Sequence, residues 1–431
     1  MLTPASLATS SRRNPGTRRI PGRTGRPASA GANRARRVRR NVRSSVLPSL
    51  MAPGYSALIL VRGSSGTSRV PWNPFAPVFD WAQASTKFGE HNMRRRILGG
   101  TGMSVSEFAL GTMMLGAMGN TDHAESVGMI HTALDAGINF IDTADVYSAG
   151  ESEEIVGKAL KGRRDGVVLA TKFALPMGPD DNQRGGSRRW ITQAVEASLR
   201  RLGTDYIDLY QMHRWDPATD PDETLSALSD LIRAGKVRAI GSSLFHPEQM
   251  VEAQWVAERR NHQRFRSEQP PYNILLRGIE ATTLPTAQRY GMGVLTFGPL
   301  GSGWLSGRAD PTAGHRNAGP AKLLFDQTEP GNQAKAEAVG RLTELAAEAG
   351  LKMSHLAIAF VLTHPAVTSV LIGPRTPAQL ADLLSGAGVE LSDDVLDRID
   401  EIVPPGVNLN QKDILFLPST LGDKRTRRRL V

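Results

Sequence analysis

The chain has 431 residues and no cysteine, which excludes disulfide bonds, thiolate catalysis and zinc–thiolate sites. Its formal net charge is +10, but residues 1–92 hold 15 Lys and Arg against two acids and residues 423–431 hold five against one, so residues 93–422 carry a net charge of −7. This mildly acidic middle part argues against a basic groove for nucleic acid.

Residues 1–92 form a basic segment that is rich in Arg, Ser, Pro and Gly and has no sustained periodicity. Such a composition is typical of a disordered extension. The run 34–40 is basic enough to bind an acidic partner, and the Arg-rich, acid-poor composition of the segment also resembles a transit peptide. Translation from too early a start codon is favoured over a targeting role, because Met93 is a natural start for a folded domain. The apolar run 57–61 is too short for a signal peptide or a membrane span.

We therefore divide the chain into an extension at 1–92, a folded domain at 93–405 and a C-terminal tail at 406–431. No stretch of the sequence reaches the apolar length that a membrane helix needs. We expect a cytoplasmic protein without a membrane or nucleic-acid partner.

The first expected element of the folded part is a β-hairpin. Its strands are predicted at Arg95–Leu98 and Val105–Ala109, with a glycine turn at Gly99–Gly102. The glycines resemble a dinucleotide-binding fingerprint, but their spacing differs from it and no strand–helix crossover follows. A hairpin is the better interpretation.

From residue 108 onwards, apolar strands alternate with amphipathic helices. The apolar run 108–112 leads to the first helix, and a polar stretch at 308–331 that interrupts the alternation is expected to be a mobile loop. Further strands are predicted at 139–143, 167–172, 206–212, 237–242, 265–269, 293–297 and 369–372, and helices at 123–136, 152–161, 188–202, 222–234, 247–259, 279–290, 333–349, 354–362 and 377–384.

Together these segments form eight strand-then-helix units over roughly 275 residues, which is typical of an α/β protein with a (β/α)8 TIM barrel. A doubly wound parallel sheet is the alternative. That fold would carry a glycine fingerprint after its first strand, and none is present. Because catalytic side chains of a barrel gather at the carboxyl ends of its strands, functional residues are expected there.

Three neighbouring strand ends carry ionisable residues. Asp142 ends one strand and Tyr147 lies in the loop after it, Lys172 ends the next strand, and His213 follows the strand after that. Singly, each residue also fits a structural role at a strand end, but adjacent strands bring all of them to one mouth.

These residue types suit one task. A phenol has an ordinary pKa of about 10 and is too weak an acid for neutral pH. A neighbouring ammonium lowers that pKa, a carboxylate holds the ammonium charged, and a histidine can orient a substrate oxygen. The set predicts proton donation to a carbonyl oxygen as a hydride reaches its carbon.

Five short motifs, spread along the folded part of the chain, resemble those of a known protein family. They are Phe140–Tyr147, Ala170–Lys172, Tyr206–His213, Gly235–Ser242 and Leu371–Thr376. Through them the chain, over about residues 95–405, resembles the aldo-keto reductase superfamily. The order of the motifs is similar to the branch that holds potassium-channel β subunits and bacterial aldo/keto reductases. The resemblance implies that Tyr147 is the general acid, that Lys172 and Asp142 tune it, and that His213 orients the substrate.

The resemblance also implies a nicotinamide cofactor, usually NADPH, bound without a Rossmann fold. Ser242 and Gln269 would hold the nicotinamide carboxamide, with Ser243 as a shorter neighbour than the Asn or Arg of many relatives. Phe297 would stack on the nicotinamide or simply fill the core, and Arg375 would bind the 2′-phosphate of NADPH. The full set expected to bind the cofactor is Thr112, Asp142, Ser242, Ser243, Gln269, Phe297, Gly298, Pro299, Leu300, Ser302, Gly373, Arg375, Thr376, Gln379 and Asp382.

The substrate pocket is expected at the same rim. Four large apolar side chains of the rim loops would give it an aromatic-lined mouth, although each could instead pack within its loop. An apolar or aromatic carbonyl compound would suit such a mouth. The residues expected to line it are Met113, Met114, Tyr147, His213, Trp215 and Trp304.

Two functional hypotheses follow. The first is an NADPH-dependent oxidoreductase that reduces aldehydes or ketones, works without a metal, and is a monomer or a homo-oligomer. The second is a nucleotide-binding regulatory subunit of the channel β-subunit type with little turnover. The complete Asp142, Tyr147, Lys172 and His213 set favours the enzyme, because a binding module has no need of a general acid.

Overall fold

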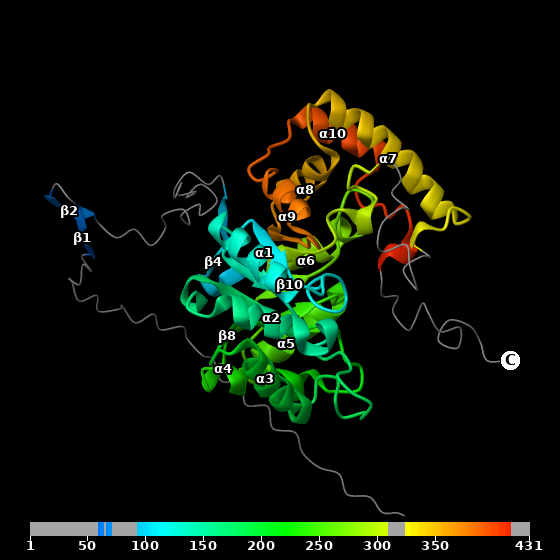
Figure 1. The fold of residues 1–431 in the computed structure, drawn as a ribbon. Coiled ribbons are helices and arrows are strands. Elements are labelled where there is room, and N and C mark those ends of the chain that lie inside the picture. Colours follow the sequence, from blue (N-terminus) through cyan, green and yellow to red (C-terminus); the bar gives the residue numbers. More distant parts are fainter. Residues whose placement is uncertain (1–58, 64–65, 71–92, 309–323, 415–431) are drawn as a thin grey trace, which may run out of the picture. The chain divides into compact units, whose positions relative to one another are not determined.

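A computed structural model describes residues 59–63, 66–70, 93–308 and 324–414 (Figure 1). Most of the predicted extension, most of the loop expected at 308–331 and the end of the C-terminal tail therefore lie outside the described residues. Within the extension, β1 (Ile59–Gly63) and β2 (Gly66–Val70) pair as an antiparallel hairpin. This hairpin belongs to a unit of its own, Met1–Pro77, and all other described elements belong to the unit Val78–Val431.

The second unit is built on a closed barrel of eight strands, as predicted. Neighbouring strands pair in parallel, and the barrel closes where the last strand pairs with the first, Val370 lying opposite Phe108. The strands are β5 (Phe108–Gly111), β6 (Phe140–Asp142), β7 (Val168–Phe173), β8 (Ile207–Met212), β9 (Val237–Ser243), β10 (Ser267–Gln269), β11 (Gly293–Thr296) and β12 (Val367–Ile372).

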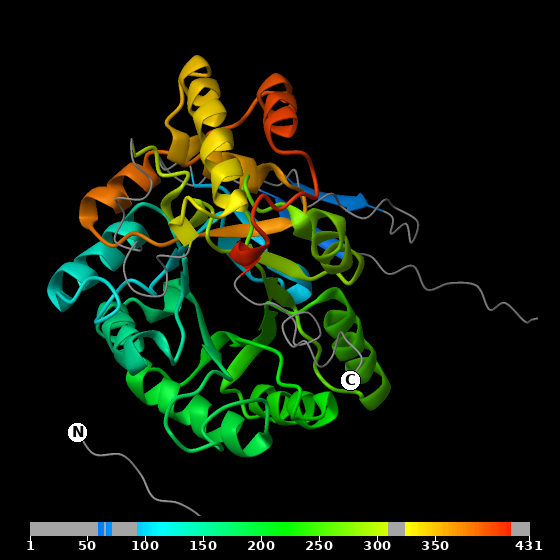
Figure 2. The same ribbon diagram turned by 90° about the vertical axis from the view of Figure 1, so that its right-hand side faces the viewer.

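Helices surround the strands (Figure 2). In α3 the buried stripe includes Ile191, Val195 and Leu199. Ser187 caps the first turn of this helix, and Gly203 ends it in the left-handed region. The helices are α1 (His123–Asp135), α2 (Glu151–Leu160), α3 (Arg188–Leu202), α4 (Pro221–Arg233), α5 (Pro247–Arg260), α6 (Thr283–Arg289), α7 (Pro330–Glu348), α8 (Met353–Thr363), α9 (Pro377–Leu384) and α10 (Asp393–Ile402).

The predicted hairpin closes the amino end of the barrel. It consists of β3 (Arg95–Ile97) and β4 (Ser104–Ser106), and its buried Leu98 and Val105 join the small apolar cluster inside the barrel. Gly99, at φ +50°, lies so close to β11 that a Cβ would come within 2.8 Å of the Gly293 nitrogen. The carboxyl end of the barrel is left for the functional site.

The predicted second strand of this hairpin, Val105–Ala109, is wrong. The chain turns at Glu107, whose buried carboxylate accepts a hydrogen bond from Arg94, so β4 ends before it. Phe108 then begins the first barrel strand. The polar residues Ser106 and Glu107 mark the change of sheet, and the prediction joined the apolar residues on both sides of them into one strand.

Two helices also differ from the prediction. The continuous helix expected at 279–290 is broken at Thr282 into a 3-10 turn and α6, because Pro285 has no N–H to donate to the preceding turn. Helix α10 was not predicted, although Ser392 caps it and Val395 and Ile399 form its buried stripe.

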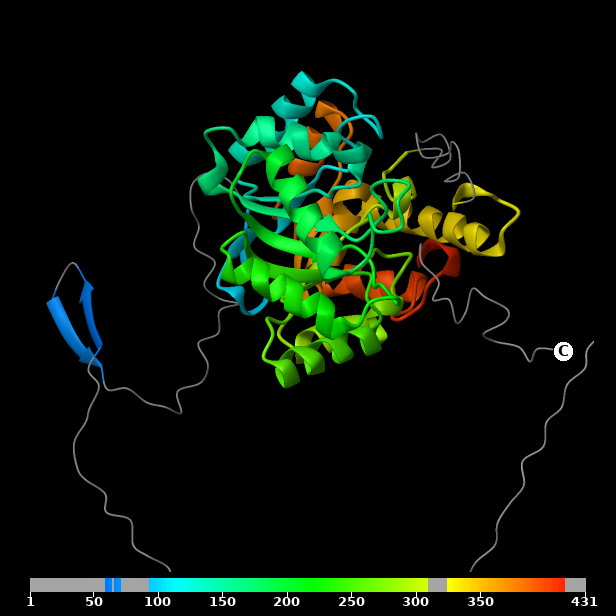
Figure 3. The same cartoon turned by 90° about the horizontal axis from the view of Figure 1, so that it is seen from below.

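The residues after α10 continue along the barrel unit. α10 and α7 lie side by side (Figures 1 and 3). Beyond them, the amide of Leu409 donates to the carbonyl of Leu275, and the buried Lys335 of α7 pairs with Asp413 at 2.8 Å. Residues 406–414 therefore contact the folded domain.

Of the helices in the described residues, none is by itself long and apolar enough to cross a membrane. One pair, α7 with α8, meets the length and composition of a span when taken together, but it bends by 94° at its break.

Asp145 carries a buried carboxyl group in the loop that follows β6. Within the described residues no side chain donates a hydrogen bond to either of its oxygens, and the backbone N–H of Val146 is the donor that acts on it. Burial, followed by the charge of Glu153, raises the pKa of Asp145 to about 8, against the opposing charges of Arg201 and Lys172. Folding therefore favours the protonated form of this group.

We expect this carboxyl group to make stability fall as the pH rises. Between the ordinary aspartate pKa and about 8, the folded chain holds a proton on Asp145 that the unfolded chain has lost, so the free energy of unfolding decreases with pH. Urea unfolding of the wild type and of Asp145→Asn at several pH values measures the effect. An undiminished slope in the variant would assign the pH dependence to other groups.

We also expect a chain that begins at Met93 to fold as the full chain does. Both apolar core clusters of the described residues draw their members from residues 93–409. The free energy of unfolding, followed by circular dichroism in urea, should change by less than ~0.5 kcal/mol, the size of a peripheral effect. A larger loss would place part of residues 1–92 in the folded domain.

Candidate active site

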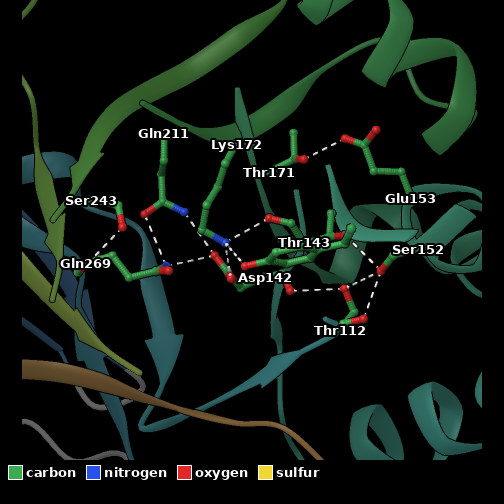
Figure 4. Close-up of polar contacts among 11 residues, drawn as sticks. Thr112, Asp142, Thr143, Ser152, Glu153, Thr171, Lys172, Gln211, Ser243 and Gln269 are labelled. Carbon is green, nitrogen blue, oxygen red and sulfur yellow. Dashed lines mark hydrogen bonds and ion pairs between the residues drawn. The ribbon is translucent and has the colours of Figure 1, made fainter. Parts of the chain in front are cut away.

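A buried ion pair lies at the carboxyl end of the barrel. The Lys172 ammonium donates to the Asp142 carboxylate at 2.5 Å and to the Thr143 carbonyl at 2.9 Å (Figure 4). Burial lowers the pKa of Lys172, but Asp142 and Tyr147 outweigh it, so the net pKa lies above its ordinary value. Lys172 therefore keeps its charge although no part of its side chain is exposed.

Two glutamines hold the second oxygen of Asp142. The side-chain amides of Gln211 and Gln269 each donate to it at 2.9 Å (Figure 4). Gln211 lies on β8 in register with Lys172 and was not predicted as a site residue. Its one signal in the sequence is a polar side chain near the carboxyl end of β8, two residues before His213. Donors from three strands thus fix the carboxylate.

Tyr147 stands beside this pair on a 3-10 turn, Tyr147–Gly150. Its hydroxyl lies 3.3 Å from the Lys172 nitrogen. Burial raises the pKa of Tyr147, and the charge of Lys172 opposes this rise without cancelling it. Lys172 therefore acts in the expected direction, but the net shift is upward. At neutral pH the phenol keeps its proton and can donate it.

His213 packs edge-on against Tyr147, with ring centroids 5.8 Å apart. Its ring is 8% exposed, and within the described residues its Nδ1 has no hydrogen-bond partner. Burial, with the charges of Lys172 and Arg214, lowers its pKa well below the ordinary value. The ring is therefore neutral at physiological pH and keeps one N–H to donate.

A cavity of about 740 Å³ opens in front of these residues. It reaches from the loops after β5 and β8 to the start of α9. Most of the residues predicted for cofactor and substrate meet around it. These are Thr112, Met113, Met114, Asp142, Tyr147, His213, Ser243, Gln269, Phe297, Gly298, Pro299, Leu300, Ser302, Gly373, Arg375, Gln379 and Asp382.

Sequence reasoning missed part of the lining. Arg214 directly follows His213, and its charge is a signal that could have placed it at the same rim. Met118 extends the methionine-rich loop after β5, and Ser354 and Ile358 come from α8. Helix α8 reads as a buried apolar segment, so its sequence gives no sign of a side facing the cavity.

Two residues predicted to touch the cofactor are engaged elsewhere. The Ser242 hydroxyl donates to the buried carboxylate of Glu268 at 2.5 Å. Thr376 caps α9, its hydroxyl accepting from the Gln379 amide. Neither lines the cavity.

Two tryptophans predicted for the substrate mouth also lie off the cavity. Trp304 is 3% exposed and stacks on Phe325 with ring centroids 5.6 Å apart. Trp215 packs edge-on against Phe245 at 5.2 Å. The apolar side chains of the cavity wall come instead from the methionines of the loop after β5 and from residues such as Leu175, Phe297 and Leu300.

The cavity wall also includes a glycine-containing loop after β11 and the side chain of Arg375. Gly298, at φ +68°, begins a glycine-rich turn along the wall. Arg375 lies half-buried just before α9, and its backbone is fixed on both sides, since its N–H donates to Gln379 and its carbonyl accepts from Asn120. The guanidinium of Arg375 at this wall suits an anionic group.

Comparison with known proteins agrees with this geometry. Residues 107–404 match the sequence model of the "Aldo/keto reductase family". The "Uncharacterized oxidoreductase YrpG" of Bacillus subtilis is 39% identical over 328 residues, which cover 73% of this chain and 97% of that protein. The "Aldo-keto reductase YhdN" of the same organism is 39% identical over 310 residues, covering 70% and 91%.

The "Putative voltage-gated potassium channel subunit beta" of Schizosaccharomyces pombe is 32% identical over 332 residues, which cover 75% of this chain and 96% of that protein. The matched region holds the whole barrel and all the rim residues described above. With this coverage and these motifs, the chain belongs to the aldo/keto reductase family.

Proposed function

We propose that this oxidoreductase reduces aldehydes and ketones to alcohols, with NADPH as cofactor and Tyr147 as the proton donor. The observation that carries the proposal is the Tyr147 hydroxyl, protonated and 3.3 Å from the Lys172 ammonium at the wall of the cavity. The neutral His213 beside it has an N–H for the same substrate oxygen. A site that only bound a nucleotide would need neither group.

The cavity suits a dinucleotide. Its volume of about 740 Å³ lies in the range of small-molecule and cofactor sites. A Cβ at Gly298 or Gly373 would meet no atom within 4 Å, so a ligand can approach the backbone there. When bound, the nicotinamide supplies the hydride that reduces the carbonyl carbon. Phe297 would stack against its ring and Ser243 would accept from its carboxamide, since the Ser243 hydroxyl already donates to Gln269.

Side chains of the protein supply the proton, stabilise the phenolate that remains and orient the substrate oxygen. Tyr147 donates its proton to the carbonyl oxygen, and the adjacent Lys172 charge stabilises the phenolate that remains. Asp142 holds Lys172 in place, because three hydrogen bonds fix that carboxylate. His213 donates to the same substrate oxygen and sets its direction.

The second candidate is a nucleotide-binding regulatory subunit with little turnover. Similarity to proteins named as potassium channel β subunits favours it. A panel of aldehydes and ketones with NADPH, followed at the absorbance of reduced nicotinamide, separates the two candidates. Turnover of a carbonyl class supports the enzyme, whereas tight NADPH binding without turnover on any class supports the regulatory subunit.

We expect Tyr147→Phe to lower kcat by ~10²-fold or more, because it removes the proton donor and keeps the ring. The dissociation constant for NADPH should stay nearly unchanged. Tyr290→Phe is the control, since Tyr290 ends α6 away from the cavity. Comparable turnover in wild type and Tyr147→Phe would remove Tyr147 from the mechanism.

We expect Arg375→Ala to weaken NADPH binding by roughly 1.5–3 kcal/mol, the usual size of hydrogen bonds to a charged group. NADH has no 2′-phosphate, so its affinity should barely change. Dissociation constants of both cofactors measure the difference, with the exposed Arg289→Ala as control. An equal loss for NADH and NADPH would mean that Arg375 supports its loop and does not bind the phosphate.

A further inference from the structure

The first turn of α2 is attached to the barrel by polar side chains. Ser152 and Glu153 are fully buried, although both are polar and lie at a helix start. The Ser152 hydroxyl lies 2.9 Å from the Thr112 hydroxyl and 3.2 Å from the Thr143 hydroxyl (Figure 4). The Thr171 hydroxyl donates to Glu153 at 2.6 Å.

Each threonine lies at the carboxyl end of a different barrel strand. Thr112 follows β5, and Thr143 directly follows Asp142 at the end of β6. Thr171 directly precedes Lys172 on β7. We refer to Ser152 and Glu153 with these three threonines as the α2 clamp. The α2 clamp thus connects one helix turn to three adjacent barrel strands.

The charge of Glu153 is compensated inside the protein. Arg201 of α3 donates to its second oxygen through two nitrogens, at 2.7 and 2.6 Å. With Thr171 on the first oxygen, both oxygens of the buried carboxylate have partners. A buried carboxylate with fixed partners on both sides is a rigid connection, because breaking either bond leaves a charge poorly satisfied.

The α2 clamp acts on the turn that carries Tyr147. Between Tyr147 and α2, Ser148 and Ala149 have φ values of 50° and 55°, and Gly150 has 101°. Left-handed non-glycine residues are strained and persist only where the surrounding structure holds them. Arg201 also packs over Gly150, where a Cβ would come 2.7 Å from its side chain.

We propose that the α2 clamp positions Tyr147 against Lys172, with the Glu153–Thr171 hydrogen bond as the link between the two elements that carry them. Tyr147 enters α2 through the strained turn, and Thr171 is the chain neighbour of Lys172. Ser152, Glu153 and Thr171 do not line the cavity, so they are positioning residues. The inference rests on the proposed function, in which Tyr147 gives up its proton beside Lys172.

The link can be removed with little change of shape. Thr171→Val deletes the hydroxyl that Glu153 accepts from, and Thr171→Ser keeps it. Thr132→Val is the matched control, because the Thr132 hydroxyl bonds only within the exposed face of α1. We expect Thr171→Val to lower kcat by ~10- to 100-fold, the size of a small misplacement of a reacting group. The dissociation constant for NADPH should stay within about twofold, since the cavity wall is untouched.

The Thr171→Ser variant tests whether the hydroxyl of residue 171 is what matters, or only the packing of its side chain. Thr171→Ser should restore most of kcat, and Thr132→Val should leave it unchanged. Glu153→Gln, which keeps an acceptor for Thr171 but loses the ion pair, should fall between wild type and Thr171→Val. Unchanged kcat in Thr171→Val, or no recovery in Thr171→Ser, would overturn the proposal.

A readout without turnover keeps the proposal separate from the proposed function. The Tyr147 phenol can be followed by carbon NMR of ring-labelled tyrosine, its signal identified by its loss in Tyr147→Phe. Lys172 lowers the pKa of this phenol, whereas burial and Asp142 raise it, so separation from Lys172 should raise the pKa further. We expect a rise of at least ~0.5 unit in Thr171→Val, well within the spread that protein environments produce, and its reversal in Thr171→Ser.

The proposed function and the role of the α2 clamp can be disproved separately. If no carbonyl is reduced by the wild type, the proposed function is wrong, and the tyrosine pKa alone tests the positioning. If carbonyls are reduced but the Tyr147 pKa and kcat are the same in wild type and Thr171→Val, the proposed function stands and the role of the α2 clamp is wrong.

Discussion

The site depends on one buried ion pair, Lys172 with Asp142. Neither side chain is more than 1% exposed, so each charge is tolerable only because the other compensates it. The parallel pairing of β6 and β7 places the two side chains at neighbouring strand ends. Gln211 and Gln269 then saturate the remaining carboxylate oxygen. The barrel rim is thereby fixed as one hydrogen-bonded unit across β6, β7, β8 and β10.

The ion pair determines how the surrounding groups ionise. Burial would push the pKa of Lys172 down and that of Tyr147 up, and the contact between the two groups counteracts both shifts. The result is an ammonium next to a phenol that still holds its proton. A neutral His213 packs edge-on against the ring of this phenol. Such a set can donate a proton at neutral pH and afterwards stabilise the phenolate.

The position of the Tyr147 side chain depends on the turn that carries it. Tyr147 lies outside the strands, on a strained turn whose dihedral angles the local sequence does not favour. The connections that could hold this turn come from α2, α3 and three strand ends. In the role that we propose for the α2 clamp, this is the reason that Ser152, Glu153 and Thr171 are fully buried although they do not line the cavity. The same burial leaves Asp145 with a raised pKa.

The sequence by itself determined the alternation of strands and helices, the barrel and the placement of Asp142, Lys172 and His213 at strand ends. These features follow from local periodicity and from the geometry of parallel strands. Only the tertiary structure decided which side chains meet. Ser242 bonds Glu268 and Trp304 stacks on Phe325, away from the cavity, whereas Gln211 joins Asp142. Residues far apart along the chain select these partners by packing, and no local pattern carries that information.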